Sequence, residues 1–569
     1  MPLNSYEFLF AFLPITVCGF WLLLGSGRRA LVPGWLLIAS VAFYAYGNLA
    51  SLAIITPSLL VDYALARYML HLPASRDRLR KAVFSLGITL NVLFLGYFKY
   101  RGFFLDSLNS VFATHFEVAR IIFPLGISFL VFQKIAFLAD VRSGEVQQIS
   151  LVDYSLFMLF FPRALAGPIV HYKEVMPQLT ETRIRTPVTH VAVGICLLSI
   201  GLFKKAVIAD GVGNYAVALF DPPRDPDFAD LPPTLLYSWA GTLCYTLQLY
   251  FDFSGYSDMA LGAARTLGIR LPMNFNSPFK ASNLVEFWGR WHVTLTRFLT
   301  AYVYTPMVLS LTRARIKAGK DVLRGRHSTL RVIGILVAMP TIITMALSGL
   351  WHGAGWQFVL WGLLHGIGLT ATQTWRLLHP AGVAVSVVWQ RLTKILAQCL
   401  TFGFVAIALV FFRSPSVGVA LAILRGMAGA NGVLTHNMQT LESAGVPTPW
   451  SMLELSLPIQ PLLWIVTLLP IVTLMPNSLQ LLRRFQPALD FPQQQPGDDE
   501  IEIAGRGSPA PLRRDESMSW KLRSGWADLK RVAQEGMELA PRTALLAALL
   551  FGLGVMASSH GGGFIYGQF

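Results

Sequence analysis

A succession of long apolar runs constrains the fold of this chain more than any other feature. Roughly a dozen of them reach or approach the length of about 20 helical residues that crosses a hydrocarbon core. The composition agrees, because 54% of the 569 residues are hydrophobic and only 14% are charged, with a mean hydropathy of +0.53. A membrane interior offers no water to unpaired backbone groups, and the runs lack the alternation of a barrel strand. We therefore expect an all-α, polytopic membrane protein.

The net charge of +15 is concentrated in short loops beside the apolar runs. Arg28 and Arg29 follow the first run, basic residues recur at 76–81, and the loop 311–331 carries many Lys and Arg residues against one acid, Asp321. The positive-inside rule assigns such loops to the cytoplasm and the N-terminus to the opposite side. The charge thus indicates topology rather than nucleic-acid binding, with an anionic leaflet or a CoA-like ligand as secondary attractions.

One apolar stretch, residues 160–170, is unsuited to a continuous helix because it contains Pro162, Gly167 and Pro168. Proline fixes φ and removes a backbone donor. We expect a re-entrant or broken segment buried in protein, since irregular backbone at membrane depth needs protein or water around it.

Charged residues also occur within the apolar runs. Lys204 and Lys205 stand near the end of the run 191–208, where we expect their long side chains to reach the membrane interface. Asp252 and Asp258 lie in the aromatic run 235–261, and two uses remain open for them: a structural polar network, or a role around the active site.

The distribution of polar segments predicts three parts. Residues 1–476 form the transmembrane core, and residues 477–541 form a polar cytoplasmic loop that is partly disordered, with a Gln/Pro/Asp/Glu cluster at 493–500. Residues 542–569 hold the last transmembrane helix, at 543–557, and an aromatic tail outside the cytoplasm.

Two Trp-His pairs, Trp291-His292 and Trp351-His352, stand sixty residues apart in apolar surroundings. An ionisable side chain at membrane depth is costly, so each histidine is a candidate functional residue. On a continuous helix His292 would point the same way as Trp288 and Trp291, into protein, while Glu286 and Arg290 would pair on another face.

His352 is the stronger candidate, because Gly349, Gly353 and Gly355 surround it. These glycines permit a helix break and a close approach of a ligand to the backbone. A neutral imidazole there can accept a proton from a substrate hydroxyl. For His365 we favour a structural role.

Other chemistries lack their residue patterns. There is no His-Glu-x-x-His segment and no closely spaced cysteine pair, so we expect no metal. Ser348-Gly349 lacks the Gly-x-Ser-x-Gly frame of a serine nucleophile. The four cysteines lie singly in apolar runs and are expected to be small buried hydrophobes.

Taken together, several motifs resemble the membrane-bound O-acyltransferases, in particular the branch of the alginate O-acetyltransferase membrane subunit. The resemblance covers nearly the whole chain, through the segments 4–10, 161–169, 203–210 and 250–258, both Trp-His pairs and the closing Phe564-Ile565-Tyr566. It implies a ring of roughly a dozen tilted helices around a central funnel, with a tunnel that brings a cytoplasmic acyl donor to the histidine.

The resemblance also implies roles for individual residues. His352 corresponds to the family's essential histidine and would act as general base on a hydroxyl that attacks an acyl thioester, while His292 would orient substrate or assist proton movement. Trp351, Trp291, Asn274 and Asp252 are candidate substrate-binding residues, and Tyr566 is a candidate transient acyl carrier or else an interfacial anchor. Three departures from the pattern are Arg163, Gly567 and Thr300-Ala301 before Tyr302.

The function implied is O-acetylation of a secreted exopolysaccharide, such as alginate or cellulose. Acetyl-CoA or an acyl carrier thioester would be the donor substrate, no cofactor would be bound, and periplasmic acetyltransferases would be partners. The location would be a bacterial inner membrane with both termini periplasmic. Two alternatives remain: an acyltransferase for another acceptor (teichoic acid, peptidoglycan, protein or lipid), and a transporter with histidines along a polar path.

Overall fold

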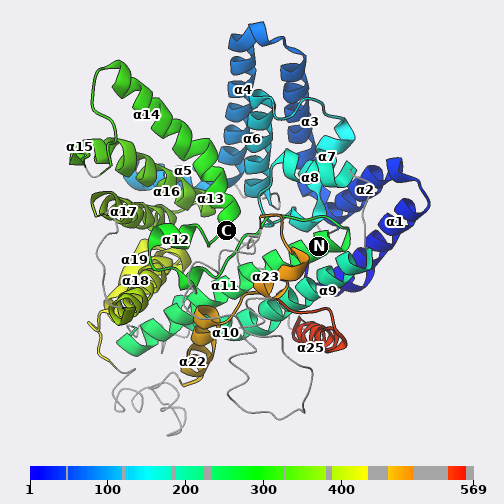
Figure 1. Ribbon diagram of the computed structural model, residues 1–569. Helices are drawn as coiled ribbons and strands as arrows, with labels where there is room; N and C mark the ends of the chain where they lie inside the picture. The colour runs from blue at the N-terminus through cyan, green and yellow to red at the C-terminus, as the bar shows by residue number, and fades with distance from the viewer. Residues whose placement is uncertain are drawn as a thin grey trace, which may run out of the picture.

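The computed structural model describes residues 1–46, 49–117, 124, 126–180, 187–221, 233–325, 327–379, 387–433, 459–490 and 536–558. This part of the chain consists of helices and connecting segments, and Phe275 and Trp291 form an isolated antiparallel bridge (Figure 1). The prediction of an all-α fold is confirmed.

In the described residues, seven helices are long and apolar enough to cross a membrane. They are Glu7–Gly25, Leu49–His71, Asp77–Phe112, Pro187–Phe220, Leu330–His352, Val388–Arg413 and Pro541–Ser558, and shorter apolar helices cover Arg29–Ala45, Val417–Met427 and Ile459–Leu474. Large apolar side chains such as Leu22, Leu400 and Leu545 are exposed on them. Such an exposed apolar surface suits lipid rather than water.

The elements of the N-terminal half precede the long central helix in the chain. They are η1 Glu7–Phe12, α1 Leu13–Gly25, α2 Val32–Ala45, α3 Leu49–His71, α4 Asp77–Leu95, η4 Gly96–Tyr100, α5 Arg101–Phe112, α6 Ile127–Ser143, α7 Leu151–Leu159, α8 Tyr172–Thr180, α9 Pro187–Phe203, η6 Lys204–Ala209 and α10 Asp210–Phe220. Here η1, η4 and η6 are π-helical turns that widen longer helices.

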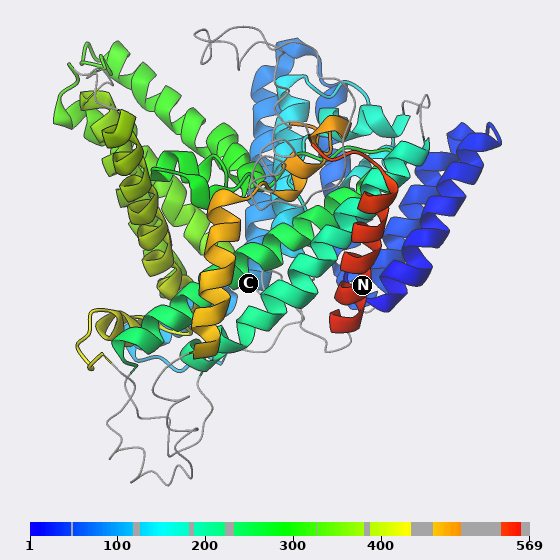
Figure 2. The ribbon, with the colours of Figure 1, turned by 60° about the horizontal axis from the view of Figure 1, so that its bottom comes forward.

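The rest of the chain begins with α11, Leu235–Thr266. Its elements are α12 Leu284–Trp288, α13 Val293–Leu299, η8 Thr300–Tyr304, α14 Thr305–Lys317, α15 Leu330–Ile333, η9 Gly334–Ala338, α16 Met339–His352, α17 Trp356–Leu378, α18 Val387–Arg413, α19 Val417–Met427, α22 Ile459–Leu474, α23 Ser478–Leu481 and α25 Pro541–Ser558. Figures 1 and 2 show α14–α19 on one side and α1–α4 on the other, with α11 running between them.

The 32-residue helix α11 is buried along nearly its whole length, and α9 and α10 pack beside it. Glycines permit the close approach of α9 to α11. A Cβ atom on Gly201 would lie 2.6 Å from the Gly255 carbonyl oxygen, and one on Gly255 would lie 2.8 Å from that of Gly201. Small residues at such contacts are typical of helix packing in membranes.

The two lysines after α9 do not extend to the membrane interface, so that prediction is wrong. Lys204 Nζ lies 2.7 Å from Asp258 Oδ2, while Lys205 Nζ lies 2.9 Å from Asp252 Oδ1 and 2.6 Å from Asp210 Oδ1. Lys205 and Asp252 are almost completely buried. Buried charges need partners, and the acids on α11 and α10 supply them. Asp252 therefore belongs to a buried ion-pair network.

The irregular segment after α7 agrees with the prediction from its prolines. The helix ends at Leu159, a 3₁₀ turn covers Phe161–Arg163, and residues 164–171 lie outside helices and mostly buried. Side chains from other elements satisfy its backbone: Ala166 N donates to the Tyr256 hydroxyl at 3.3 Å, and Ile169 N to Thr294 Oγ1 at 3.1 Å. This is how irregular backbone is tolerated at membrane depth.

The first and last described helices lie side by side. The Tyr6 hydroxyl donates to the Val555 carbonyl at 3.0 Å, and the rings of Phe10 and Phe551 are 5.9 Å apart. The start of η1 and the end of α25 therefore lie at the same end of the molecule (Figure 2). Residues 491–535 and the tail from 559, with Tyr566, lie outside the described residues.

The beginning of the predicted polar loop belongs to the core. Asn477 caps α23 through a capping box, Leu479 and Leu482 are buried, and Arg297 Nη1 lies 3.1 Å from Asp490 Oδ2. Burial raises the pKa of Asp490, and the nearby Arg297 opposes that shift. The packed body thus continues past residue 476, where we placed the domain boundary.

Candidate active site

His352 is the last residue of α16 and points into a buried aromatic enclosure. Its ring centroid lies 5.2 Å from those of Trp361 and Phe412 and 4.8 Å from that of Trp351. Only 5% of the residue is exposed. Surroundings of this kind desolvate the imidazole and suit its uncharged form, which is the form that can accept a proton.

His292 lies between two short helices rather than within one. The helix α12 ends at Trp288, α13 begins at Val293, and His292 has φ +44° and ψ +50°. The predicted continuous helical face through residues 288–295 is therefore wrong, although the predicted pair of Glu286 and Arg290 is present at 2.6 Å. A left-handed residue with a side chain costs free energy, and such strain is concentrated at functional sites.

A strand-like pairing with an earlier segment imposes this geometry on His292. Asn276 N donates to the Arg290 carbonyl at 2.9 Å, and Val293 N donates to the Asn274 carbonyl at 3.0 Å. Together with the bridge between Phe275 and Trp291, these bonds tie residues 274–276 to residues 290–293. The pairing interrupts the helix and turns the His292 side chain toward Asn274.

Asn274 holds the His292 ring by hydrogen bonding. Its Oδ1 lies 3.0 Å from His292 Nδ1 and accepts from Thr294 Oγ1 at 3.0 Å, while its Nδ2 donates to Ser257 Oγ at 3.4 Å. Because an amide oxygen only accepts, His292 Nδ1 is the donor and the lone pair of the ring is on Nε2. The His292 and His352 ring centroids lie 6.5 Å apart, so the fold brings both histidines into one site.

The sequence is similar to a known family and to several named relatives. A model of the MBOAT, membrane-bound O-acyltransferase family, matches residues 84–319. Over 457 residues the chain is 37% identical to the peptidoglycan O-acetyltransferase of Helicobacter pylori. The aligned region covers 76% of this chain and 80% of that protein. It is also 34% identical over 434 residues to the probable alginate O-acetylase AlgI of Pseudomonas aeruginosa, over 75% of each chain.

The chain belongs to the membrane-bound O-acyltransferase family. A more distant relative is the teichoic acid D-alanyltransferase of Bacillus subtilis, 28% identical over 52% of this chain and 70% of that protein. The chain is therefore a multi-pass membrane acyltransferase, as its apolar helices and its resemblance predicted.

The glycines near His352 serve helix packing in this acyltransferase. A Cβ atom on Gly349 would lie 2.1 Å from the Phe358 carbonyl oxygen, and one on Gly362 would lie 2.3 Å from that of Met345. Gly353 faces the ring of Phe358. The expectation that these glycines leave room for a ligand is therefore not met, because α17 fills the space beside α16.

The two tryptophans of the Trp-His pairs occupy different places. Trp351 stacks on Phe132 with centroids 5.0 Å apart, and Phe132 stacks on Phe298 at 4.3 Å, which forms an aromatic column beside the histidines. Trp291 instead packs among the rings of Phe275, Phe279, Phe287 and Tyr250. Of the predicted site residues, the structure thus gathers His352, His292, Asn274 and Trp351, and it places Trp291 and Asp252 in neighbouring clusters.

Sequence reasoning missed the contribution of α6 to this site. Phe129 lies 6.4 Å from His292 and 5.1 Å from Trp351 between ring centroids, and Phe132 belongs to the aromatic column. The sequence did offer a clue, because the polar residues Gln133 and Lys134 interrupt this apolar run. In the structure both are buried. His365 accepts from Trp288 Nε1 at 3.3 Å, which agrees with a structural role.

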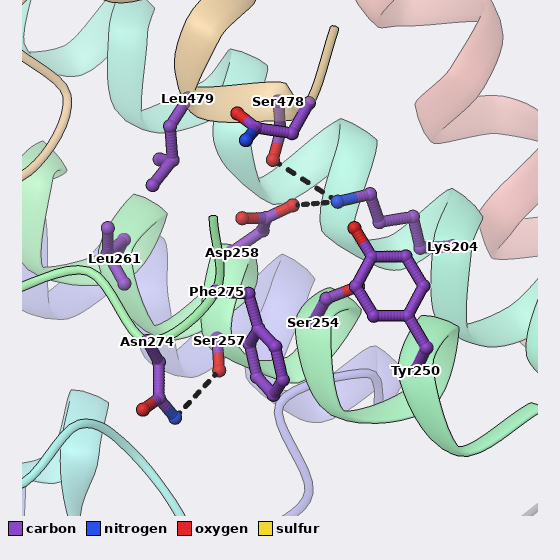
Figure 3. A pocket seen from close by; sticks show the side chains of 11 residues that line it. Lys204, Tyr250, Ser254, Ser257, Asp258, Leu261, Asn274, Phe275, Ser478 and Leu479 are labelled. Atoms are coloured by element: carbon purple, nitrogen blue, oxygen red, sulfur yellow. Dashed lines mark hydrogen bonds and ion pairs between the residues drawn. The ribbon is translucent and has the colours of Figure 1, made fainter. Parts of the chain in front are cut away.

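A small polar cavity lies on the far side of Asn274 (Figure 3). Lys204, Asp258, Ser254, Ser257 and Tyr250 line it, with Asn274 on one side and residues 477–479 on the other. Figure 3 shows Lys204 contacting both Asp258 and Ser478. The cavity connects the beginning of the polar loop with the residue that orients His292.

Proposed function

We propose that this acyltransferase moves an acetyl group from a thioester donor on the cytoplasmic side to a hydroxyl group that serves a cell-envelope polysaccharide. The main support is the pair of buried histidines, whose rings lie 6.5 Å apart in a mostly aromatic enclosure. The named activities of the relatives, O-acetylation of alginate and of peptidoglycan, support acetyl as the transferred group.

In the proposed reaction His352 accepts the proton of the acceptor hydroxyl while its oxygen attacks the thioester carbonyl. The C–S bond breaks, and the thiolate leaves with that proton as a thiol, so the reaction needs no redox partner and no metal. His292 orients the substrate, because Asn274 and Thr294 fix its ring. Tyr566 is the proposed transient acceptor in a relay. Acetyl-CoA or an acyl carrier thioester is the proposed donor.

We place the chain in the inner membrane with both termini periplasmic. The basic connections α1–α2, α3–α4 and α14–α15 lie at one end of the molecule in Figure 2. The positive-inside rule makes this end cytoplasmic. The contact of Tyr6 with Val555 then puts the chain's beginning and the end of α25 at the other end. Acetyltransferases of the periplasm are the proposed partners.

Two acceptors are separable by experiment. An exopolysaccharide of the alginate or cellulose kind agrees with the alginate relatives, and peptidoglycan agrees with the relative of 37% identity. The test compares the acetate content of secreted polymer and of purified peptidoglycan from cells with the parent protein or His352→Ala. His379→Ala is the matched control, because His379 is an exposed histidine at the end of the neighbouring α17.

Loss of acetate from one polymer, with an unchanged polymer yield and equal protein levels, is the expected result for His352→Ala alone. The polymer that loses acetate identifies the acceptor pathway. Normal acetylation of both polymers would contradict the catalytic role of His352. A reduced yield of the polymer itself would instead support transport of a polysaccharide.

A further inference from the structure

The π-helical turn η4 packs its last two residues against the end of α16, the helix that carries His352. Lys99 Nζ donates to the carbonyl oxygens of Trp351 at 2.5 Å and His352 at 3.1 Å, and it contacts Ser128 Oγ at 3.3 Å. The Tyr100 hydroxyl donates to the Leu350 carbonyl at 2.8 Å. Three consecutive carbonyls of the last helical turn thus have partners from one neighbouring segment.

The carbonyl groups at the end of a helix need hydrogen-bond donors, and inside a membrane the protein itself must supply them. The last four carbonyls of a helix lack intrahelical donors, and the helix dipole gives that end a partial negative charge. Water satisfies these groups at a surface, but an apolar membrane interior provides none. A lysine ammonium has three N–H donors, so Lys99 can donate to the carbonyl oxygens of Trp351 and His352 and to Ser128 Oγ.

These contacts bring the Lys99 amine to the backbone of the residue that is proposed to act as base, and the carbonyl acceptors and partial negative charge of the helix end favour its ammonium form. A cation close to an imidazole opposes its protonation, and the imidazole must be unprotonated to accept a proton. Within the described part of the chain, His352 is also faced by His292, with its ring at 6.5 Å, and by His365, which contacts Trp361 on the same side. The helix α18 contributes only the uncharged ring of Phe412 to the contacts described for His352.

We propose that Lys99 is a positioning residue of the acyl transfer: it fixes the last turn of α16 and, through its charge, keeps His352 in the base form. The proposal rests on the proposed function, because it assumes that His352 is the general base. The contacts of Lys99 described above are with the backbone and with Ser128, not with the His352 ring. Lys99 therefore acts through the position of the backbone and through the electric field at His352.

Tyr100 provides a matched control, because it binds the same helix end without a charge. If the two residues only hold α16, then losing either should lower the rate at every pH. If the charge of Lys99 acts on His352, then only its loss should change the pH dependence. Replacements of Lys99 can further separate the charge from the hydrogen bonds: Lys99→Arg retains both, Lys99→Gln retains N–H donors, and Lys99→Met removes both.

The experiment measures release of free thiol from acetyl-CoA as a function of pH, with the purified full-length chain in lipid vesicles and unacetylated alginate or peptidoglycan as the hydroxyl acceptor. For Lys99→Met and Lys99→Gln we expect a lower maximal rate and an acidic limb that moves to higher pH by about one unit, as for the loss of a nearby charge. Lys99→Arg should keep the limb of the parent. Tyr100→Phe should lower the rate and leave the limb in place.

An acidic limb for Lys99→Gln that coincides with that of the parent would overturn the proposal, even if the rate fell. A limb that moved equally in Tyr100→Phe would also overturn it, because the shift would then come from helix displacement. Thermal unfolding and elution volume establish that each variant is folded, and Lys99→Gln decides the question if Lys99→Met does not fold. A parent that releases no thiol, with His352→Ala as reference, would contradict the proposed function itself.

Discussion

The two Trp-His pairs have the same two residues and opposite means of fixing the histidine. His292 stands on a left-handed backbone between α12 and α13, and the Asn274 amide holds its ring. His352 ends a regular helix, and the rings of Trp351, Trp361 and Phe412 surround it. One histidine is oriented by hydrogen bonds, and the other is enclosed by apolar contacts.

This difference fits the two roles that we propose for the histidines. A ring held by a polar partner has a defined tautomer and direction, which suits the orientation of a substrate. A ring held by aromatic faces and by its helix is desolvated, which suits a base that must be uncharged when the substrate arrives. The dipeptide therefore does not determine the role of its histidine.

The largest expected effect separates the two histidines by rate. His352→Gln removes the proposed base and should lower acetyl transfer by about 10³-fold, within the range for general base catalysis. His292→Gln should cost about 10²-fold at most, because it disturbs orientation and leaves the base in place. The measurement is thiol release from acetyl-CoA by equal amounts of folded protein. A larger loss in His292→Gln would reverse the assigned roles.

The enclosure of His352 depends on the contact between α16 and α17, and Gly349→Ala tests it. The added methyl group would meet the Phe358 carbonyl, so the helices must separate. We expect a loss of about 1–3 kcal/mol in stability, as for other overpacked sites, together with lower activity. Gly403→Ala is the control, because nothing lies within 4 Å of its Cβ position. Thermal unfolding that is equal in the two variants would refute this contact.

The polar fixation of His292 predicts a coupling with Asn274. Asn274→Ala should lower the rate about tenfold through loss of orientation, and it should have almost no effect in a His292→Gln background. A double-mutant cycle of transfer rates measures this. Additive effects of the two substitutions would show that Asn274 acts on something other than His292.

The smallest effects should distinguish the two tryptophans. Trp351→Phe removes the Nε1 hydrogen bond to the Ser128 carbonyl, 3.4 Å long, and alters the stack on Phe132 next to His352. It should therefore change KM for the donor severalfold. Trp291→Phe changes a packed cluster and should lower only the unfolding temperature by a few degrees. An equal change of KM in both variants would remove the distinction between the two pairs.

Much of the fold could be predicted from local patterns. The apolar runs gave the helical membrane class, Pro162 and Pro168 gave the irregular segment, and the last apolar run gave α25. Such predictions succeed because the hydrophobicity of a segment and the position of a proline determine the structure of the backbone within a few residues. Pro57 shows the limit, since it lies inside α3 without ending that helix.

The errors arose where distant segments meet. Lys204 and Lys205 were expected at an interface, yet carboxylates on α10 and α11 hold them inside. The helix expected through Trp288 and His292 is interrupted by pairing with residues 274–276. Neither partner is visible in the local pattern, because ion pairs and non-local backbone bonds depend on the packing of the whole chain.

The sequence by itself determined that this chain is a helical membrane protein, which loops are basic, and that two histidines stand in apolar surroundings. Hydropathy, charge and residue spacing carry that information, and each is a local property. Only the tertiary structure decided that the two histidine rings lie 6.5 Å apart, that Asn274 holds one, and that Lys99 binds the helix end of the other. These facts depend on contacts between residues up to 253 positions apart, and packing alone brings such residues together.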